Sequence, residues 1–317
     1  FASIDGVENI DCNANEKLLR KDFTKSIQSS LIGQRSCGIL LSGGLDSTSV
    51  AVSCSELEII SRSYTLFSPK EENFELAQAK KTSLELGFDH IPVELNIKDA
   101  LEVIQQLPKI IDYPNPDPSI ISSYIVAKEA SKNRDTILLT GDGGDEIFGG
   151  YNRYLNYLKR FGYIYKFLPI YMRIKILKRY LRNFSTGFSY KNFEIDNYLA
   201  KLINKNDSLL LNLCQLDQLF YMTNHTLPKT DRAFMFFSLE GRAPLLNNFF
   251  KSFSKTYLLN NPYSNKKEFL RNYVRNRLGS LYISSYKKGF TPFLDKLAAN
   301  GEFLNTLISA NKKLMEF

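Results

Sequence analysis

The chain has 317 residues, of which 44% are hydrophobic and 23% charged, as in a folded protein with one large domain or two smaller ones. A net charge of +8 fits an anionic partner such as a nucleotide, but nucleic acid or an acidic membrane face would fit equally. Four cysteines without a Cys-x-x-Cys pair, and only two histidines, argue against a disulfide framework and a zinc site. The sequence has no signal peptide and no apolar run of membrane-spanning length, so we expect a reduced, cytoplasmic protein.

The first half of the chain predicts strands that alternate with helices. Such alternation is typical of βαβ units, and hence of a mostly parallel, doubly wound α/β sheet that binds ligands beyond the carboxyl ends of its strands. We expect Asn96 and Ser119 to cap helices. The predicted strands are Ile39–Leu41, Ser63–Phe67, His90–Leu95 and Thr136–Thr140, and the predicted helices are Glu16–Leu31, the segment after Leu45, Phe74–Leu86, Ile97–Leu107 and 120–131.

From Tyr151 onward the strand signal disappears and the pattern becomes helical, with prolines as breaks. We therefore divide the chain into an α/β core with its N-terminal helix, 1–150, and a helical part packed around it, 151–317. The basic, aromatic stretch Phe161–Leu181 fits either a membrane- or nucleic-acid-binding helix or a solvated basic face with its aromatic side packed inward. We favour the inward-packed arrangement, because Pro169 interrupts the amphipathic run, and expect neither membrane nor nucleic acid as a partner.

The first candidate site follows the opening strand. The apolar run Ile39-Leu40-Leu41 meets the turn Ser42-Gly43-Gly44, and Leu45-Asp46-Ser47 then opens a helix. Paired glycines allow close backbone approach, and the free N–H groups of a helix start favour an anion such as phosphate. Asp46 is placed to hold Mg²⁺ on such phosphates. The alternative is an ordinary strand-to-helix turn that needs glycine, and the spacing excludes a Walker A loop.

A second glycine-rich loop follows the strand that ends at Thr140. The stretch 140–151 reads TGDGGDEIFGGY and carries three carboxylates, Asp142, Asp145 and Glu146. So dense an acidic cluster repels itself unless a cation neutralises it. One such loop would also fit a calcium site or a bare turn. Two of them, both at strand ends, indicate a metal–nucleotide complex.

The chain resembles the glutamine-dependent asparagine synthetase family, in its C-terminal synthetase (ATP pyrophosphatase) domain. The loop 42–47 is similar to the pyrophosphate loop of ATP pyrophosphatases, and 140–151 to the second signature of the synthetases. Further matches in order are Asp112 with Pro118-Ser119, Leu227-Pro228-Lys229, Asp231-Arg232, Ser238–Leu246, Lys266–Arg271 and Lys287-Lys288-Gly289-Phe290. The resemblance implies an adenine nucleotide alpha hydrolase-like fold.

The resemblance also implies roles for individual residues. Asp46 and Asp145 would be Mg²⁺ ligands, Lys287 would contact the α phosphate of ATP, with Lys288 as the fallback, and Asp142 would handle a proton of the attacking nucleophile. Arg232 and Arg242 match basic family positions, and Arg242 beside Glu240 fits a structural ion pair better than a phosphate ligand. The residues implied for ATP and pyrophosphate are Leu40 and Leu66 around the adenine, Ser42, Gly43, Gly44, Asp46 and Ser47 at the phosphates, and Thr140 and Gly141 at the ribose.

Three departures from the family pattern bear on the substrate and the nitrogen source. Asp142 stands where many asparagine synthetases carry Glu, and where members that close β-lactam rings carry Tyr. Leu246-Asn247 stands where the commoner family sequence is Phe-Leu-Asp, after the Arg-x-Pro motif. The glutaminase half, which needs a cysteine at a free N-terminus, is missing, and the internal Cys12 cannot replace it. Ammonia would come from a glutaminase domain that precedes the chain, a separate subunit or solution.

The resemblance therefore implies an AMP-forming carbon–nitrogen ligase that uses ATP and Mg²⁺ to convert aspartate into asparagine, and a homodimer is the expected assembly. The same chemistry on another carboxylate, such as sugar-acid amidation or macrolactam or β-lactam closure, is the first alternative. A non-catalytic nucleotide-binding scaffold is disfavoured because Asp46, Asp145 and Lys287 occur together. A tRNA-modifying ATP pyrophosphatase fits the basic charge but would need catalytic cysteines or a nucleic-acid module, and neither is evident.

Overall fold

The computed structural model describes residues 12–32, 36–59, 62–69, 74–113, 117–184, 194–204, 206–260, 267–279, 301 and 305–309. The chain forms two compact units. The first contains 1–141, 228–244 and 269–317, and the second contains 142–227 and 245–268. The boundary near residue 150 that we expected from the sequence differs from this division, because two later segments of the chain return to the first unit.

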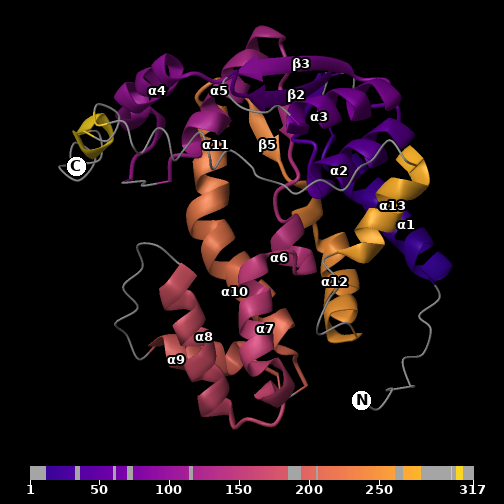
Figure 1. Cartoon of the computed structure of the whole chain (residues 1–317), viewed down its shortest axis with the longest axis vertical. Helices are drawn as coiled ribbons and strands as arrows, with labels where there is room; N and C mark the ends of the chain where they lie inside the picture. Colours follow the sequence, from indigo (N-terminus) through magenta and orange to yellow (C-terminus); the bar gives the residue numbers. More distant parts are fainter. Residues whose placement is uncertain are drawn as a thin grey trace. The chain divides into compact units, whose positions relative to one another are not determined.

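The first unit is built on a five-stranded sheet with the order β3-β2-β1-β4-β5 (Figure 1). Every neighbouring pair is parallel, which confirms the predicted doubly wound α/β fold. Short apolar runs form the central strands because both faces of the sheet are covered by helices. The strands are β1 (Cys37–Leu40), β2 (Arg62–Phe67), β3 (Asp89–Glu94), β4 (Ile137–Leu139) and β5 (Glu240–Arg242).

Strand β5 is a correction to the sequence prediction, which placed no strand after Tyr151. The strand has only three residues, Glu-Gly-Arg, and pairs with β4 from Ile137↔Glu240 to Leu139↔Arg242. A polar edge strand of this length has no apolar run or alternation to reveal it. Gly241 is required there, because a Cβ would lie 2.8 Å from the ring of Phe234.

The helices of the first unit begin and end close to the predicted positions, with one error in capping. Asn96 caps α4 as predicted, since its side chain accepts from the Asp99 N–H at 2.9 Å. Ser119 does not cap α5; instead its own N–H donates to Asp117 Oδ1 at 2.9 Å. The helices are α1 (Cys12–Ser29), α2 (Leu45–Glu56), α3 (Phe74–Glu85), α4 (Ile97–Ile110), α5 (Ile120–Lys132), α11 (Leu227–Met235) and α13 (Glu268–Leu278), the last two reaching one residue into the second unit.

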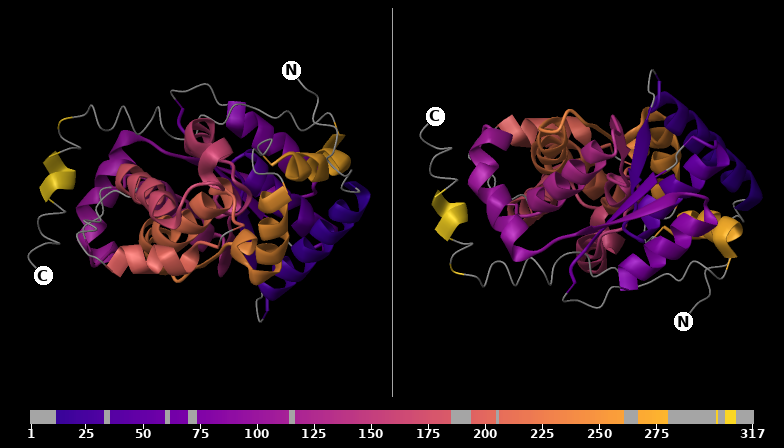
Figure 2. Two further views of the ribbon diagram at one scale, coloured as in Figure 1. Left: turned by 90° about the horizontal axis from the view of Figure 1, so that it is seen from below. Right: turned by 90° about the horizontal axis from the view of Figure 1, so that it is seen from above.

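Helix α13 lies beside α1 and α2, although more than 200 residues separate them in the sequence (Figure 2). The ring of Tyr273 stacks on Phe23 with centroids 5.0 Å apart. Arg20 joins α1 to α2 through an ion pair of 2.8 Å with Glu56. The late segment is therefore part of the first unit's packed structure and not an appendage.

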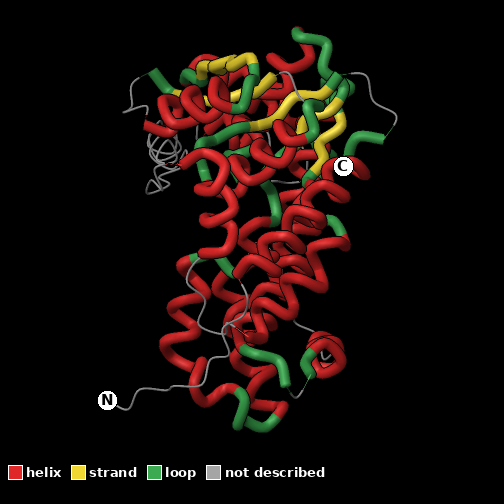
Figure 3. The backbone as a smooth tube through the Cα atoms, turned by 90° about the vertical axis from the view of Figure 1, so that its right-hand side faces the viewer, coloured by secondary structure: helices red, strands yellow, loops and turns green. Residues whose placement is uncertain are grey.

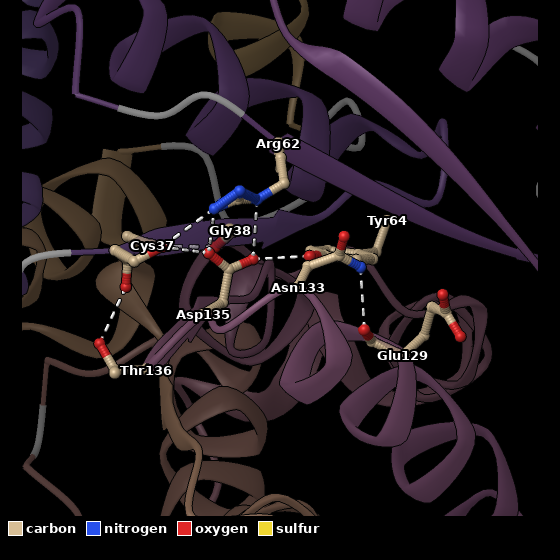
Figure 4. Close-up of polar contacts among 9 residues, drawn as sticks. Cys37, Gly38, Arg62, Tyr64, Glu129, Asn133, Asp135 and Thr136 are labelled. Atoms are coloured by element: carbon tan, nitrogen blue, oxygen red, sulfur yellow. Dashed lines mark hydrogen bonds and ion pairs between the residues drawn. The ribbon is translucent and has the colours of Figure 1, made fainter.

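A buried carboxylate, Asp135, ties together the amino-terminal ends of three strands (Figure 4). It accepts from the hydroxyls of Tyr64 and Ser36, both at 2.6 Å, and pairs with Arg62 at 3.2 Å. Burial, followed by the hydrogen bond to Asp135, raises the pKa of Tyr64 well above its usual value. Gly38 makes room for this network, since a Cβ would lie 2.6 Å from the Tyr64 ring. Because ligands bind at the opposite edge of such sheets, we regard the network as structural.

The second unit consists of helices and loops in the residues described, and all described strands belong to the first (Figure 3). Its core is rich in tyrosine and leucine, including Tyr154, Tyr165 and Tyr180. Arg153, Tyr154 and Tyr180 all donate to the buried Asp217. The elements are α6 (Gly144–Phe148), α7 (Asn152–Tyr165), α8 (Ile170–Phe184), α9 (Glu194–Leu202), α10 (Leu209–Leu216), the π-helical η1 (Asp217–Thr226), the 3₁₀ turn η2 (Pro244–Leu246), whose first residue belongs to the first unit, and α12 (Asn248–Asn260).

Candidate active site

The sheet changes its direction of winding between β1 and β4. From β1 the chain adds β2 and β3 on one side, and then returns to place β4 on the other side of β1. Loops that leave two such strands diverge at their carboxyl ends and leave a crevice, where open α/β sheets bind their ligands. Both glycine-rich loops of the sequence follow these two strands. The topology therefore puts the predicted site at the switch point of the sheet.

The loop after β1 holds itself in shape through two serines. The Ser47 hydroxyl lies 3.0 Å from the Ser42 hydroxyl, accepts from the Ser42 N–H at 3.2 Å and donates to the Gly44 carbonyl at 3.2 Å. Gly43 has a φ of +72°, and a Cβ there would lie 2.9 Å from the Glu75 carbonyl oxygen. Ser47 is buried, so its main contribution in this conformation is to fix the loop.

Helix α2 begins directly behind this loop. Its N-cap residue is Gly44, in extended conformation, which has no side chain to satisfy the first N–H groups. Asp46 lies in the first turn of the helix and is partly exposed. These N–H groups and the positive end of the helix dipole favour an anion at this point.

The end of β4 packs against the start of α2. A Cβ on Gly141 would lie 2.5 Å from the Ser47 backbone nitrogen and 2.9 Å from the Asp46 carbonyl carbon. Only glycine allows this approach without displacing the backbone of either segment. The preceding Thr140 is buried, and its N–H donates to the Arg242 carbonyl at 2.9 Å, which anchors the loop to β5. The two predicted loops thus meet at their backbones.

The residues predicted to enclose an adenine lie on one face of the sheet. Leu40 pairs in register with Tyr64, and Leu66 lies two residues further along β2, so all three side chains point to the same side. Leu66 is buried in the core cluster, while Leu40 is partly buried against it. The pair provides an apolar surface near the carboxyl ends of β1 and β2.

The second loop continues into the second unit, which begins at Asp142. Gly143 and Gly149 flank α6 in the left-handed region, with φ of +89° and +73°. Gly150 is enclosed, because a Cβ there would lie 1.9 Å from Asp145 Oδ1. The dense glycines therefore fold the acidic segment 142–150 into one short helical turn.

Within the second unit, Asp145 forms an ion pair with Lys267, with Oδ1 and Nζ 2.6 Å apart. The Lys267 side chain is 5% exposed, whereas that of Asp145 is 26% exposed and reaches solvent. The sequence placed Lys267 within a family-like segment but gave it no role. The ion pair was not predictable, because Lys267 is far from Asp145 in the sequence and nothing distinguishes it there from the adjacent Lys266.

The third carboxylate of the loop, Glu146, is buried and points away from the solvent. It accepts from the Tyr151 hydroxyl at 2.7 Å. Burial, partly offset by this hydrogen bond, raises the pKa of Glu146 to about 7. We therefore assign Glu146 to the packing of the loop, and Asp142 and Asp145 remain the candidates for chemistry.

A second buried lysine, Lys229, lies in the first unit near the starts of α5 and α11. Lys229 donates to Asp117 at 2.8 Å and contacts the Ser119 hydroxyl. Burial disfavours the charge of Asp117, but the charge and hydrogen bond of Lys229 outweigh it, and the pKa of Asp117 is lowered.

The arginines singled out from the sequence are also paired. Arg232 lies 3.1 Å from Asp112, and Arg242 binds Glu240 and the Ser30 carbonyl, as expected of a structural residue.

Residues 18–315 match the family model for asparagine synthase. The chain belongs to the asparagine synthase family. Its two signature loops are the ones that meet at Gly141 and Ser47.

Curated relatives of this asparagine synthase family chain align with parts of it. The glutamine-hydrolysing asparagine synthetase 1 of Bacillus subtilis (strain 168) is 37% identical over 120 residues, which are 37% of this chain and 18% of the relative. The asparagine synthetase of Bos taurus is 28% identical over 163 residues, 47% of this chain and 29% of the relative. The chain thus matches less than a third of the length of either relative. Among solved structures, the NMN synthetase of Francisella tularensis aligns with 89% of this chain and 100% of its own, at 12% identity and a TM-score of 0.34.

Lys287, which we predict to contact the α phosphate, lies outside the described residues, as does Lys288. Both stay predictions. Among the residues that the structure describes, no group of three or more His, Cys, Asp or Glu is arranged to hold a metal. Mg²⁺ at nucleotide sites is commonly held by one or two carboxylates together with the phosphates, and the roles of Asp46 and Asp145 as its ligands stay predictions. No helix among the described residues is long and apolar enough to cross a membrane.

Proposed function

We propose that this chain is the synthetase part of an ATP-dependent amide-forming ligase that converts aspartate into asparagine, AMP and pyrophosphate. The single observation that carries the proposal is the contact of Gly141 with the Ser47 backbone at the switch point of the sheet. This contact places the start of α2, which can bind a phosphate, next to the loop that resembles the family's second signature. Family membership and the names of the curated relatives support the choice of aspartate.

The loop 42–47 would hold the phosphates of ATP. The N–H groups at the start of α2 would donate to the phosphate oxygens, and Ser42 and Ser47 keep the turn in place through their mutual hydrogen bonds. The adenine would lie on the apolar surface of Leu40 and Leu66, and the ribose at Thr140 and Gly141. Asp46 and Asp145 would bind Mg²⁺, which neutralises phosphate charge when bound.

The proposed chemistry has two steps. A carboxylate oxygen of aspartate attacks the α phosphorus of ATP, so that an acyl-adenylate forms and pyrophosphate leaves. Ammonia then attacks the acyl carbon, AMP leaves, and the nitrogen loses a proton, for which Asp142 is the proposed acceptor. Lys287 would stabilise the charge that develops on the α phosphate.

The nitrogen source is a separate part of the proposal. The relatives are named as glutamine-hydrolysing enzymes, and their names support a glutaminase domain or subunit that delivers ammonia to this chain. Ammonium in solution would replace it in an assay of the chain alone. A homodimeric assembly also stays a proposal.

The direct test is incubation with ATP, Mg²⁺, aspartate and ammonium, with pyrophosphate and asparagine measured together. We expect the two products in equal amounts. Pyrophosphate release with a different carboxylate, but not with aspartate, would keep the ligase and change its substrate. No release with any carboxylate in a screen of amino acids, sugar acids and β-amino acids would contradict the proposal.

Three substitutions separate the proposed roles. Lys287→Ala should lower turnover by about a hundredfold or more and leave ATP binding nearly unchanged, with Lys288→Ala as its matched control. If Lys288→Ala has the larger effect, the assignment moves by one residue. Asp46→Asn should weaken Mg·ATP binding, while Asp142→Asn should spare pyrophosphate release and slow amide formation.

A further inference from the structure

The positive charge of the chain is concentrated in two helices of the second unit. Residues 152–184, which form α7 and α8, contain nine Lys and Arg residues and no Asp or Glu. The chain has 41 basic and 33 acidic residues, so the remainder has 32 basic against 33 acidic and is nearly neutral. The net charge of +8 is thus a property of this helical pair and not of the molecule in general.

Large apolar side chains are exposed where α7 ends and α8 begins. Phe167 is 87% exposed, Tyr163 75% and Tyr171 67%. Ile164 and Ile170 are also about half exposed. We call residues 163–172 the α7–α8 tip. Exposed apolar side chains that cluster in this way commonly mark a binding surface.

The sequence led us to expect the aromatic side of this stretch to pack inward, and the structure corrects that expectation in part. Tyr157, Tyr165 and Tyr180 are buried in the core of the second unit, as expected. Tyr163, Phe167 and Tyr171 are not. The break at Pro169 explains the difference, because it starts a new helix and leaves the residues around the turn without a core to face.

The exposed faces of both helices have the same arrangement of charge. On α8, Tyr171, Lys175, Arg179 and Arg182 lie on one face at spacings of four, four and three residues, and all four are exposed. On α7, the exposed Lys159 and Arg160 precede Tyr163 and Ile164 by three or four residues. Lys159, Arg160 and Lys175 therefore lie about one turn from the apolar tip, and Arg179 and Arg182 follow about two and three turns along α8. The tip has a basic collar on both sides.

The tip is held in this conformation by a buried arginine. The guanidinium of Arg173 donates to the carbonyl oxygens of Lys166 and Leu168 in the connecting turn, and to that of Asn204. Tyr157 and Tyr180 pack edge to face, with centroids 5.2 Å apart, and fix α7 against α8. The outward direction of Phe167 and Tyr171 is therefore built into the fold.

We propose that the α7–α8 tip binds the surface of a bilayer that contains anionic phospholipids. Aromatic and aliphatic side chains would enter the boundary between headgroups and acyl chains, and the collar of Lys159, Arg160 and Lys175 would contact the phosphates. Arg179 and Arg182, further along α8, would add to the attraction. Aromatic residues combined with lysine and arginine are typical of interfacial binding, and basic residues near an anionic surface strengthen it.

Other occupants fit this surface less well. A second copy of the chain would bring two strongly basic surfaces together, and the repulsion would oppose association. Nucleic acid would satisfy the charges and stack on the aromatic rings, but it would gain little from Ile164 and Ile170. Acyl chains are the partner for which aliphatic side chains at the centre and cations at the rim are both favourable.

The proposal is tested by sedimentation of the full chain with phosphatidylcholine vesicles, with or without about 30 mol% phosphatidylserine. We expect binding only to the anionic vesicles, and less of it as the salt concentration rises, because the collar is exposed. Phe167→Ser with Tyr171→Ser should reduce the partition coefficient about tenfold or more, and Lys175→Glu with Arg179→Glu should do the same.

Matched controls use exposed residues of the first unit. Ile32→Ser with Leu84→Ser removes apolar side chains that are 75% and 65% exposed, and Lys81→Glu with Lys98→Glu reverses exposed charges; both pairs should bind vesicles like the wild type. Circular dichroism and pyrophosphate release would verify folding of every variant. Equal binding to neutral vesicles, no binding to either kind, loss of binding in a control pair, or preference for a single-stranded RNA competitor would overturn the proposal.

Discussion

At the scale of single residues, Gly141 is the position on which the candidate site depends most directly. It stands where two backbones approach so closely that a methyl group would meet the Ser47 nitrogen at 2.5 Å. Gly141→Ala must therefore push the second loop away from the start of α2. We expect ATP affinity to fall about tenfold or more and the free energy of unfolding to fall by about 1–3 kcal/mol. Calorimetric titration with ATP and urea unfolding would measure the two effects.

Gly301→Ala is the matched control, because a Cβ at Gly301 has nothing within 4 Å. It should leave both quantities unchanged within about 0.5 kcal/mol. If Gly141→Ala bound ATP as tightly as the wild type, the contact between the loops would have no part in nucleotide binding. A loss of stability without a loss of affinity would point to the same conclusion.

At the scale of elements, the pair of Lys229 and Asp117 joins α11 to the segment that leads into α5. Lys229→Met removes the lysine charge and leaves a half-buried carboxylate, so we expect a loss of about 2–3 kcal/mol at pH 7. Since the pKa of Asp117 is lowered in the folded chain, the pair stabilises the fold above pH about 4 and is lost as the pH falls further. The difference between variant and wild type should therefore shrink in acid, as measured by urea unfolding at pH 7 and pH 3.5.

Arg232 provides the comparison for this experiment. It pairs with Asp112 at 3.1 Å, but the two side chains are 50% and 70% exposed. An exposed pair contributes about 0–1 kcal/mol, so Arg232→Met should have a small effect at both pH values. Equal losses in the two variants would mean that burial does not strengthen the Lys229 pair.

Among the strands and helix caps, some were predictable from the sequence and others were not. Strands β1 and β4 were predictable as apolar runs, and β2 and β3 as short segments that alternate with helices. The predicted parallel order then located the ligand edge of the sheet. Strand β5 could not be predicted, since its three residues have no pattern of their own and form a strand only by pairing with β4. Ser119 was expected to cap α5 from local preference, yet its hydroxyl contacts Lys229, which is 110 residues away in the chain.

Some features of the candidate site were likewise predictable from the sequence, and others were not. Glycine spacing and strand ends were sufficient to single out Ser42, Gly43, Gly44 and Asp46, because the turn that they form is local. The reason for glycine at position 141 was not predictable, since it is a contact with the distant Ser47. The partner of Asp145 was not predictable, since Lys267 comes from a distant segment and nothing in the sequence distinguishes it from Lys266. The outward direction of Phe167 and Tyr171 was missed because composition alone cannot show which side of a helix meets the core.

At the scale of the whole molecule, the two units have separate cores and different characters. The first unit has an aliphatic core around a parallel sheet. The second has a core of tyrosines and leucines, next to the ion pair of Arg153 and Asp217 at 2.5 Å. The basic charge belongs to the second unit, in α7 and α8. The candidates for chemistry, Asp142 and Asp145, also belong to the second unit but precede α7 and α8 in the chain, so they and the proposed membrane-binding surface can be mutated separately.

Because the two units have separate cores, we expect a substitution that destabilises one unit to leave the other largely folded. Asp217 accepts hydrogen bonds from Arg153, Tyr154 and Tyr180, so Asp217→Asn leaves a buried guanidinium without its counter-charge, at a cost of about 3 kcal/mol. We expect faster amide hydrogen exchange in α7, α8 and α10, and unchanged exchange in β1, β2 and β4. Asp112→Asn, at an exposed pair, is the control and should change neither set. If the strands lost protection together with the helices, the two units would unfold as one cooperative structure, because local damage could then be relieved only by global unfolding.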